Sequence, residues 1–362
     1  MKVALVHEYL NQFGGAERVL AVLADIFPKA PIYTLLYDEK ASRGLFRGRD
    51  VRTSFLQKIP GAAKHHKLYP LLMPLAMEQF DLSGFDLVIS VSASFAKGVI
   101  TKPGTRHICY CLTPPRFLWD NSQRFAREFG FPFFIRGLMP PFISYLRLWD
   151  QQASDRVDEY WHISNFVGER IKKYYKRESK LIYPFVDTRK FTVSSLQFTD
   201  DNFFLMVGRL VSYKKFDVAI RAFNELGLNL KIIGAGPESG RLKKMAKRNI
   251  EFTGPVSDQD LSEYYQQCRA LIFPQEEDFG IVPLESMASG RPVIAYRGGG
   301  ALETVAEGKT GIFFDEPSPE SLIAAVQKFQ SMNFSAVECR QQAEKFSTDI
   351  FKATIIKTLK NI

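Results

Sequence analysis

Two glutamates, Glu277 and Glu285, stand eight positions apart on either side of Gly280. The run 270–274 before them is short and apolar, which predicts a buried strand, and a helix-like run begins near Pro283. Gly280 lets backbone amides approach a ligand closely, and a helix start favours a bound phosphate. Ionised carboxylates accept hydrogen bonds from hydroxyl groups. A ligand with both phosphates and many hydroxyls is a nucleotide sugar, so this spacing predicts a site for one.

The elements around these residues alternate between strand-like and helix-like runs, which predicts parallel sheets with crossover helices. Strands are expected at 3–6, 32–35, 87–90, 108–112, 160–163, 203–207, 230–233, 250–253, 270–274, 293–296 and 311–314. Helices are expected at 16–27, 165–175, 214–226, 237–247, 258–268, 283–289, 318–330 and 348–362. This order predicts two doubly wound α/β domains, with ligands bound at the carboxyl ends of their strands in a shared cleft.

The segment 277–294 resembles the glutamate-x7-glutamate signature of the retaining glycosyltransferases of family 4. Four other segments are similar to the same family in the same order: Gly14-Gly15-Ala16-Glu17-Arg18, Val207-Gly208-Arg209 with Lys214, Gly234-Ala235-Gly236-Pro237, and Gly298-Gly299-Gly300-Ala301-Leu302-Glu303. The resemblance covers nearly the whole chain. It implies the GT-B fold, in which two Rossmann-like domains face a common cleft. The expected parts are an acceptor-side domain at 1–183, a nucleotide-sugar-binding domain at 184–346, and a C-terminal crossover helix at 347–362.

The resemblance also assigns roles to single residues. Arg209 and Lys214 match the family's pair that holds the diphosphate, with Lys215 as the adjacent alternative to Lys214. Glu285 matches the residue that binds the ribose, and Glu277 the residue that orients the hydroxyls of the sugar. The expected catalytic residues are therefore Arg209, Lys214 and Glu277, and the other donor-binding residues are Gly14, Gly15, Gly208, Phe279, Gly280, Ile281, Val282 and Glu285.

One position departs from the family pattern. Related sequences often carry His-Thr-Pro after the strand near 106–111, whereas this chain has Leu112-Thr113-Pro114. A leucine neither donates nor accepts a hydrogen bond, so the role of that histidine is unassigned. Candidates to replace it are His7, at the end of the first strand, and Asp120. His7 could equally be a satisfied polar residue at a strand end.

No metal or other cofactor is expected. The matching places contain no Asp-x-Asp arrangement, and the cationic groups and helix ends already neutralise a leaving diphosphate. The four cysteines, Cys109, Cys111, Cys268 and Cys339, lack zinc spacing, and nothing calls for disulfides, so a cytoplasmic location is expected.

The net charge of +9 is unevenly placed, because residues 1–183 carry 26 Lys and Arg against 17 Asp and Glu. An anionic partner of this half is expected, and the sequence contains no recognised nucleic-acid motif. The segment 125–149 is rich in aromatics and is edged by Arg124, Arg127, Arg136 and Arg147, which suits a membrane interface. A helix pair packed on the domain is the competing interpretation. The segment 58–74, with Lys64, His65, His66 and Lys67, is a second candidate for the same surface.

These observations favour a retaining glycosyltransferase that moves a hexose from a nucleoside-diphosphate donor to a glycan or polyprenyl-diphosphate-linked acceptor in polysaccharide biosynthesis. The protein would be cytoplasmic, with peripheral association at the inner face of the membrane as an option. UDP-glucose is the first choice of donor, and GDP-mannose the alternative. An epimerase or phosphorylase on the same architecture is another alternative, and a non-catalytic nucleotide-sugar or glycan-binding module is the alternative of a different class.

Overall fold

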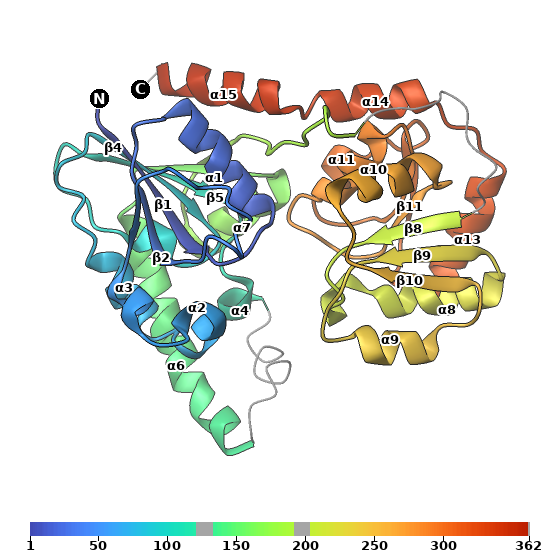
Figure 1. The fold of residues 1–362 in the computed structure, drawn as a ribbon, viewed down its shortest axis with the longest axis horizontal. Helices are drawn as coiled ribbons and strands as arrows, with labels where there is room; N and C mark the ends of the chain where they lie inside the picture. Colours follow the sequence, from blue (N-terminus) through green and yellow to red (C-terminus); the bar gives the residue numbers. More distant parts are fainter. Residues whose placement is uncertain (121–132, 192–202, 361–362) are drawn as a thin grey trace. The chain divides into compact units, whose positions relative to one another are not determined.

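The protein is represented by a computed structural model, which describes residues 1–120, 133–191 and 203–360 (Figure 1). The chain divides into two compact units. Unit 1 comprises Met1–Tyr183 together with Thr354–Ile362, and unit 2 comprises Pro184–Ala353. Each unit is built on a parallel sheet with helices packed against it, and each is described by itself.

Unit 1 contains, within the described ranges, a seven-stranded parallel sheet in the order β3-β2-β1-β4-β5-β6-β7. Its strands are β1 (Val3–Leu10), β2 (Ile32–Tyr37), β3 (Val51–Thr53), β4 (Leu87–Ser92), β5 (Arg106–Cys111), β6 (Glu159–His162) and β7 (Ser179–Leu181). Its helices are α1 (Gly15–Ile26), η1 (Phe55–Lys58), α2 (Ala62–His65), η2 (His66–Leu68), α3 (Met73–Glu78), η3 (Ala96–Gly98), α4 (Arg116–Trp119), α6 (Phe133–Asp155) and α7 (Asn165–Tyr175). The strand order reverses between β1 and β4, and ligands of such sheets bind at that reversal, beyond the carboxyl ends of the strands.

Unit 2 contains a six-stranded parallel sheet, counted over the described part of the chain, in the order β10-β9-β8-β11-β12-β13. Its strands are β8 (Phe203–Val207), β9 (Asn229–Ile233), β10 (Ile250–Gly254), β11 (Leu271–Phe273), β12 (Val293–Tyr296) and β13 (Gly311–Phe314). Its helices are η4 (Ser212–Lys214), α8 (Phe216–Leu226), α9 (Ser239–Met245), α10 (Asp258–Gln267), α11 (Ile281–Ala288), α12 (Ala301–Thr304), α13 (Pro319–Gln330) and α14 (Ala336–Glu344), followed by α15 (Thr348–Lys360). Here the order reverses between β8 and β11.

The prediction of alternating strands and helices in parallel sheets is confirmed. The helix expected at 283–289 begins two residues earlier, at Ile281. The edge strands β3 and β7 were not predicted, because each is only three residues long and mostly outside the core, so neither produces an apolar run. Helix α14 was not predicted either, because its apolar face is narrow. The last helix, α15, starts at Thr348, and its residues group with unit 1 only from Thr354 onward.

The helix starts fall into two kinds. Serine side chains cap the first turns of α7, α10, α13 and α14, where each accepts a hydrogen bond from a backbone amide. By contrast, α1 follows Gly14 and α11 follows Gly280, and neither glycine has a side chain to cap the helix. Because the first amides of a helix have no partner within it, the start of α11 presents backbone amides at the strand-order reversal of unit 2, whereas in the first turn of α1 the Glu17 carboxylate accepts a hydrogen bond from its own backbone amide.

The aromatic segment 125–149 is only partly described. From Phe133 onward it forms the 23-residue helix α6, with Pro140 and Pro141 inside it. Residues 125–132 lie outside the described ranges, so the helix-pair interpretation stays a prediction. Ile143, Leu146 and Trp149 on this helix are buried in the core of unit 1. Arg124, Arg127 and the side chain of Arg136 lie outside the described residues, so the membrane interpretation of these arginines stays a prediction. No helix in the described ranges is long and apolar enough to span a bilayer.

Candidate functional site

The loop after β8 carries the two predicted cations of unit 2. Arg209 is exposed, two residues beyond the strand, and forms no ion pair with any described residue. Lys214 ends the short helix η4, and Lys215 adopts a left-handed conformation with φ of 54° before α8 begins. Because β8 borders the strand-order reversal, both predicted cations follow a strand whose carboxyl end lies at that point of the sheet.

Glycines hold this loop against the loop after β9. A Cβ atom on Gly234, where φ is +136°, would lie 2.0 Å from the carbonyl oxygen of Gly208. A Cβ atom on Gly236 would lie 2.3 Å from the carbonyl oxygen of Leu210. The amide of Leu210 donates to the carbonyl of Ala235 over 3.0 Å. These glycines therefore bring the two backbones into contact and fix the path of the chain around Arg209.

Gly208 also leaves room for a side chain, since a Cβ atom there would lie 3.1 Å from Lys214 Nζ. That ammonium group lies 3.1 Å from Glu277 Oε1, across the reversal between β8 and β11. The Lys214 and Glu277 side chains are 15% and 24% exposed, so the ion pair is partly open to solvent. Apart from this ion pair, Glu277 Oε1 has no hydrogen-bond partner among the described residues. The structure thus brings together two predicted catalytic side chains from separate loops.

The glycine triplet 298–300 packs against the acidic loop that carries Glu277. A Cβ atom on Gly299 would lie 2.2 Å from the carbonyl oxygen of Glu277, and one on Gly300 would lie 2.3 Å from Phe279 Cα. The amide of Gly300 donates to the Glu277 carbonyl over 2.9 Å. Only residues without a side chain permit this contact, so the triplet sets the position of the acidic loop.

The start of α11 follows directly on this loop. Gly280 precedes the helix with φ of 89°, a conformation that glycine adopts without strain. Ile281 and Val282 form the first turn and are half-buried, and Phe279 is buried with its ring 5.8 Å from that of Phe346. The first-turn amides and the positive end of the helix dipole make this a position that favours an anion.

Glu285 lies one turn into α11 and is 6% exposed. Its Oε2 accepts a hydrogen bond of 3.0 Å from the hydroxyl of Tyr265, a fully buried residue on α10. The tyrosine therefore orients the carboxylate that the sequence analysis assigned to the ribose. The sequence did not reveal Tyr265, because it lies in an ordinary amphipathic helix, twenty residues from its partner and outside every recognised motif.

The corresponding point of unit 1 holds Gly14 and Gly15 at the start of α1. Gly14 is extended, and a Cβ atom there would approach Glu17 Oε2 at 3.1 Å. Glu17 is 1% exposed; its Oε1 lies 3.7 Å from His7 Nε2 and accepts a 3.0 Å hydrogen bond from Gln12. His7 Nδ1 lies 3.0 Å from the Val91 carbonyl, and these contacts make His7 a satisfied residue of the strand.

The charged groups in this cluster shift one another's pKa values. Burial lowers the pKa of His7, but Glu17 and Glu8 outweigh it, so the His7 pKa is raised overall. Burial raises the pKa of Glu17, but His7 and Gln12 outweigh it and leave that pKa below its usual value. Glu8 itself is buried, and its Oε1 accepts hydrogen bonds from Ser92 Oγ and from the backbone amides of residues 93, 94 and 96. These charges are therefore paired or hydrogen-bonded within the unit.

The segment after β5, where Leu112 replaces the family's histidine, is held by hydrogen bonds from α7. Arg170 donates to Thr113 Oγ1, to the Pro114 carbonyl and to Asp120 Oδ2. The Tyr174 hydroxyl donates to Asp120 Oδ1. Asp120, one of the candidate replacements for the histidine, is thus engaged in an ion pair, while the side chain of Leu112 is half-buried.

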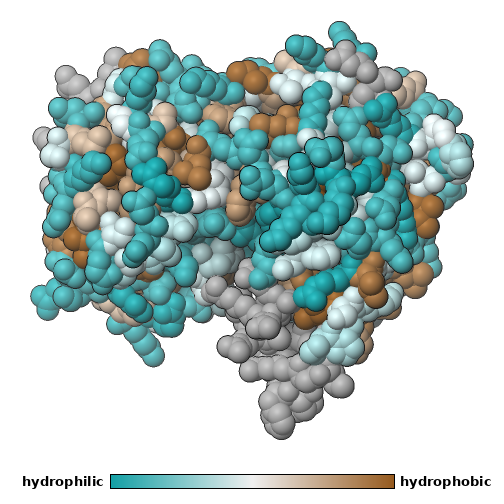
Figure 2. All heavy atoms as spheres, turned by 180° about the vertical axis from the view of Figure 1, so that it is seen from behind, coloured by the Kyte–Doolittle hydropathy of each residue, from teal (hydrophilic) through white to brown (hydrophobic). Residues whose placement is uncertain are grey.

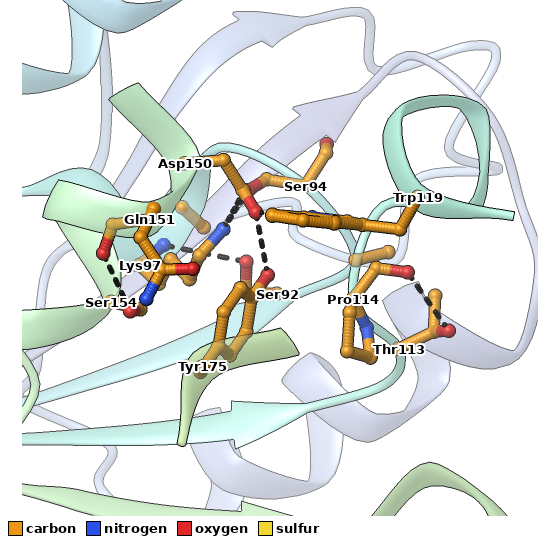
Figure 3. Close-up of polar contacts among 12 residues, drawn as sticks. Ser92, Ser94, Lys97, Thr113, Pro114, Trp119, Asp150, Gln151, Ser154 and Tyr175 are labelled. Carbon is orange, nitrogen blue, oxygen red and sulfur yellow. Dashed lines mark hydrogen bonds and ion pairs between the residues drawn. The ribbon is translucent and has the colours of Figure 1, made fainter. Parts of the chain in front are cut away.

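A buried network lies beside that segment (Figure 3). Lys97 and Asp150, which are 1% and 0% exposed, form an ion pair, and Lys97 Nζ also donates to the Ser94 carbonyl. Asp150 Oδ2 accepts hydrogen bonds from Trp119 Nε1 at 2.8 Å and from the Tyr175 hydroxyl at 2.9 Å. These contacts join η3, α4, α6 and α7, so they fix the loops that follow β4 and β5.

No group of three or more His, Cys, Asp or Glu side chains in the described ranges is arranged to hold a metal ion. What unit 2 does bring together is two cations, an uncapped helix start and two glutamates at one edge of a parallel sheet. This combination can bind a diphosphate and, beside it, a polyhydroxylated group.

Residues 187–346, which contain all of these unit 2 groups, match the family model described as glycosyl transferases group 1. An uncharacterized glycosyltransferase of Methanocaldococcus jannaschii is 29% identical over 49% of this chain and 50% of its own length. The alpha-1,3/1,6-mannosyltransferase of Mus musculus is 26% identical over 78% of this chain and 75% of its own. A GDP-mannose-dependent mannosyltransferase of Mycolicibacterium smegmatis is 34% identical over 33% and 36%. The chain therefore spans about half the length of the first of these relatives.

Solved structures share the fold. The Anabaena protein HepE, in complex with UDP-glucose, matches with a TM-score of 0.71 and 17% identity over all of both chains. The prediction of a GT-B fold is confirmed by this likeness and by the two parallel sheets. Residues 187–346 are therefore similar to the group 1 glycosyltransferases.

Proposed function

We propose that the protein is a retaining glycosyltransferase that transfers a hexose from a nucleoside-diphosphate donor to a hydroxyl group of an acceptor. The observation that carries the proposal is the Lys214–Glu277 pair across the strand-order reversal of unit 2, beside exposed Arg209 and the uncapped start of α11. The match of residues 187–346 to the group 1 glycosyltransferase model supports it, because these side chains lie in the matched segment.

In the proposed reaction, the bond between the anomeric carbon and the diphosphate oxygen breaks. The acceptor oxygen forms the new bond on the same face, and its proton passes to the departing phosphate. The leaving diphosphate gains negative charge, so fixed positive groups beside it lower the barrier. Arg209, Lys214 and the first amides of α11 supply this charge, and for that reason we propose that no divalent ion is essential.

The two glutamates take different parts. Glu285, held by Tyr265, accepts hydrogen bonds from the ribose hydroxyls. Glu277 is paired with Lys214 before the donor binds. When the diphosphate pairs with Lys214 in place of Glu277, Glu277 becomes available to accept hydrogen bonds from the hexose and to stabilise positive charge at the anomeric carbon. The backbone amides around Gly280 hold the phosphates.

The donor has two candidates. UDP-glucose is the donor expected from the sequence analysis, and the Anabaena protein of the same fold carries it. GDP-mannose is an equal candidate, since the relatives include named mannosyltransferases, one of them GDP-mannose-dependent. We propose a glycan or polyprenyl-diphosphate-linked acceptor in polysaccharide biosynthesis, reached by the protein as a peripheral enzyme at the cytoplasmic membrane face. The basic excess of residues 1–183 supports an anionic surface there.

The test is a calorimetric comparison of UDP, GDP, UDP-glucose and GDP-mannose, with slow donor hydrolysis measured in parallel, with and without a chelator. Tight binding of one nucleotide and hydrolysis of its sugar, unaffected by the chelator, is the expected result. Arg209→Ala serves as the matched inactive variant. Binding that persists with no hydrolysis or transfer, in wild type and variant alike, would instead identify a nucleotide-sugar-binding module.

A further inference from the structure

We propose that the segment from η1 to α3, residues 55–78, is a docking surface for an anionic phospholipid bilayer. Four leucines of this segment lie at the surface: Leu68, Leu71, Leu72 and Leu75 are 63%, 37%, 38% and 49% exposed. Large aliphatic side chains clustered at the surface mark interaction sites. The inference builds on the membrane-side acceptor of the proposed function and gives it a location.

The charge of the segment matches an anionic surface. Between positions 54 and 77 the sequence contains no aspartate or glutamate, and it contains three lysines and two adjacent histidines. Lys58, Lys64 and His65 are exposed, and none of them forms an ion pair with a described residue. Leucines that enter the lipid and lysines that meet the headgroups are the two components of interfacial binding.

The opposite face of the segment is firmly anchored, so the exposed leucines are not the result of a loose loop. Leu56, Met73, Ala76 and Met77 are buried in the core of unit 1. On α3, Glu78 accepts hydrogen bonds of 2.7 Å from Trp149 and from Arg156, which fasten α3 to the region of α6. The segment therefore presents its leucines on a fixed support.

A second apolar stripe lies on α6 itself. Phe142, Tyr145 and Leu148 occupy every third position and are 46%, 52% and 66% exposed. Figure 2 shows brown, hydrophobic side chains at the surface over the region of α3 and α6, among hydrophilic ones. Lipid contact by both helices explains two apolar surfaces on neighbouring elements, whereas a single small ligand explains neither.

The segment also contacts the ligand-binding edge of the unit 1 sheet. At the end of β1, the Tyr9 hydroxyl donates to Met73 Sδ over 2.8 Å, and Asn11 Nδ2 donates to the Ala63 carbonyl over 2.6 Å. The rings of Tyr9 and His66 lie 4.6 Å apart. A bilayer bound to the leucines would therefore lie beside the carboxyl end of β1, where a lipid-linked acceptor could enter without leaving the membrane.

The experiment measures co-sedimentation of the full chain with vesicles of equal parts phosphatidylglycerol and phosphatidylcholine, and with vesicles of phosphatidylcholine alone. We expect binding to the anionic vesicles that weakens with salt. The double variant Leu71→Ser with Leu72→Ser should bind about tenfold more weakly, because both leucines lose lipid contact. Lys58→Gln with Lys64→Gln should lose a similar factor on anionic vesicles only.

Matched controls lie on unit 2. Val337→Ser removes an apolar side chain that is 43% exposed on α14, and Lys244→Gln with Arg248→Gln removes two exposed charges, so both should bind as the wild type does. Thermal melts check that every variant is folded. Equal vesicle binding by the leucine variant and the wild type would overturn the proposal, as would concentration-dependent self-association that the leucine variant abolishes. Donor hydrolysis without vesicles tests the proposed function separately, so either idea can fail alone.

Discussion

The charged side chains at the strand-order reversal are accessible in unit 2 and buried in unit 1. At the strand-order reversal of unit 2, Lys214 and Glu277 are partly exposed and Arg209 is exposed, so their charges remain available to a ligand. At the reversal of unit 1, His7 and Glu17 are 2% and 1% exposed and face each other inside the unit. In one unit the charged side chains at this position are therefore accessible to a ligand, and in the other they are paired with each other inside the unit.

The glycines follow the same division. In unit 2 Gly234 and Gly299 have positive φ, and a Cβ atom on either would clash with backbone atoms. These glycines therefore determine the path of the loops that carry the site. In unit 1 Gly14 is extended and touches only the end of a carboxylate. A glycine motif in the sequence can therefore mark either a required close backbone contact or a position with some room for a side chain. The atoms that an added Cβ would meet distinguish the two cases.

The largest expected effect is on catalysis at unit 2. Lys214→Ala should lower the rate of transfer about 10²- to 10³-fold, because the leaving diphosphate loses a fixed positive charge. Lys215→Asn is the matched control, since asparagine tolerates the left-handed conformation at that position. Steady-state kinetics with a thermal melt provides the measurement. A normal rate for Lys214→Ala, or an equal loss for Lys215→Asn, would remove Lys214 from the mechanism.

The glycine comparison predicts an effect on stability. Gly234→Ala should lower the free energy of unfolding by about 4 kcal/mol, because its Cβ atom would meet the Gly208 carbonyl and its φ of +136° is strained for alanine. Gly14→Ala should cost less than about 1 kcal/mol, since only a side-chain oxygen must move. Denaturant unfolding of both variants provides the measurement, and similar losses would show that the two glycines do not differ in their structural role.

Acid stability should depend on a buried residue of unit 1. Burial lowers the pKa of His107 to about 4, while in the unfolded chain it is near 6.5. Between these values the unfolded chain binds a proton that the folded chain does not, so stability falls as pH falls. The difference corresponds to about 3 kcal/mol.

His107→Gln should flatten the pH profile of unfolding between pH 6.5 and 4. The exposed His65→Gln is the control for replacing a histidine by glutamine at the surface. His7 has the opposite sign: its raised pKa stabilises the folded state at low pH, and this contribution is lost as pH rises through the folded value. An unchanged slope in His107→Gln would exclude His107 as the source.

The smallest expected effect concerns the orientation of the Glu285 carboxylate, which we propose binds the ribose. Tyr265→Phe should weaken nucleoside-diphosphate binding about tenfold while the turnover number changes little, because Glu285 loses one donor but keeps its charge. Tyr264→Phe, on the same helix, is the control, since its ring packs on Phe203 and its hydroxyl serves no described partner. Calorimetry with UDP and GDP measures both, and equal affinities would leave Tyr265 with a packing role alone.

The elements of the site could be predicted because parallel sheets place strand ends together. The apolar run before Glu277 and the run before Arg209 are strands β11 and β8, and their adjacency puts the two loops side by side. The Tyr265–Glu285 bond could not be predicted, because a tyrosine in an amphipathic helix gives no sign of which residue its hydroxyl will meet. The burial of Lys97 and Asp150 was equally hidden, since they lie 53 residues apart and each resembles a surface residue.

The environment of Asp150 has an evolutionary consequence. A buried ion pair is strongly destabilised when one partner is lost, whereas replacing both by apolar residues of similar volume is often neutral. A lineage can therefore leave this arrangement only through a costly single-substitution intermediate or a simultaneous double change. We expect natural homologues to keep both Lys97 and Asp150 or neither, with Trp119 and Tyr175 changing alongside them because both donate to the same carboxylate.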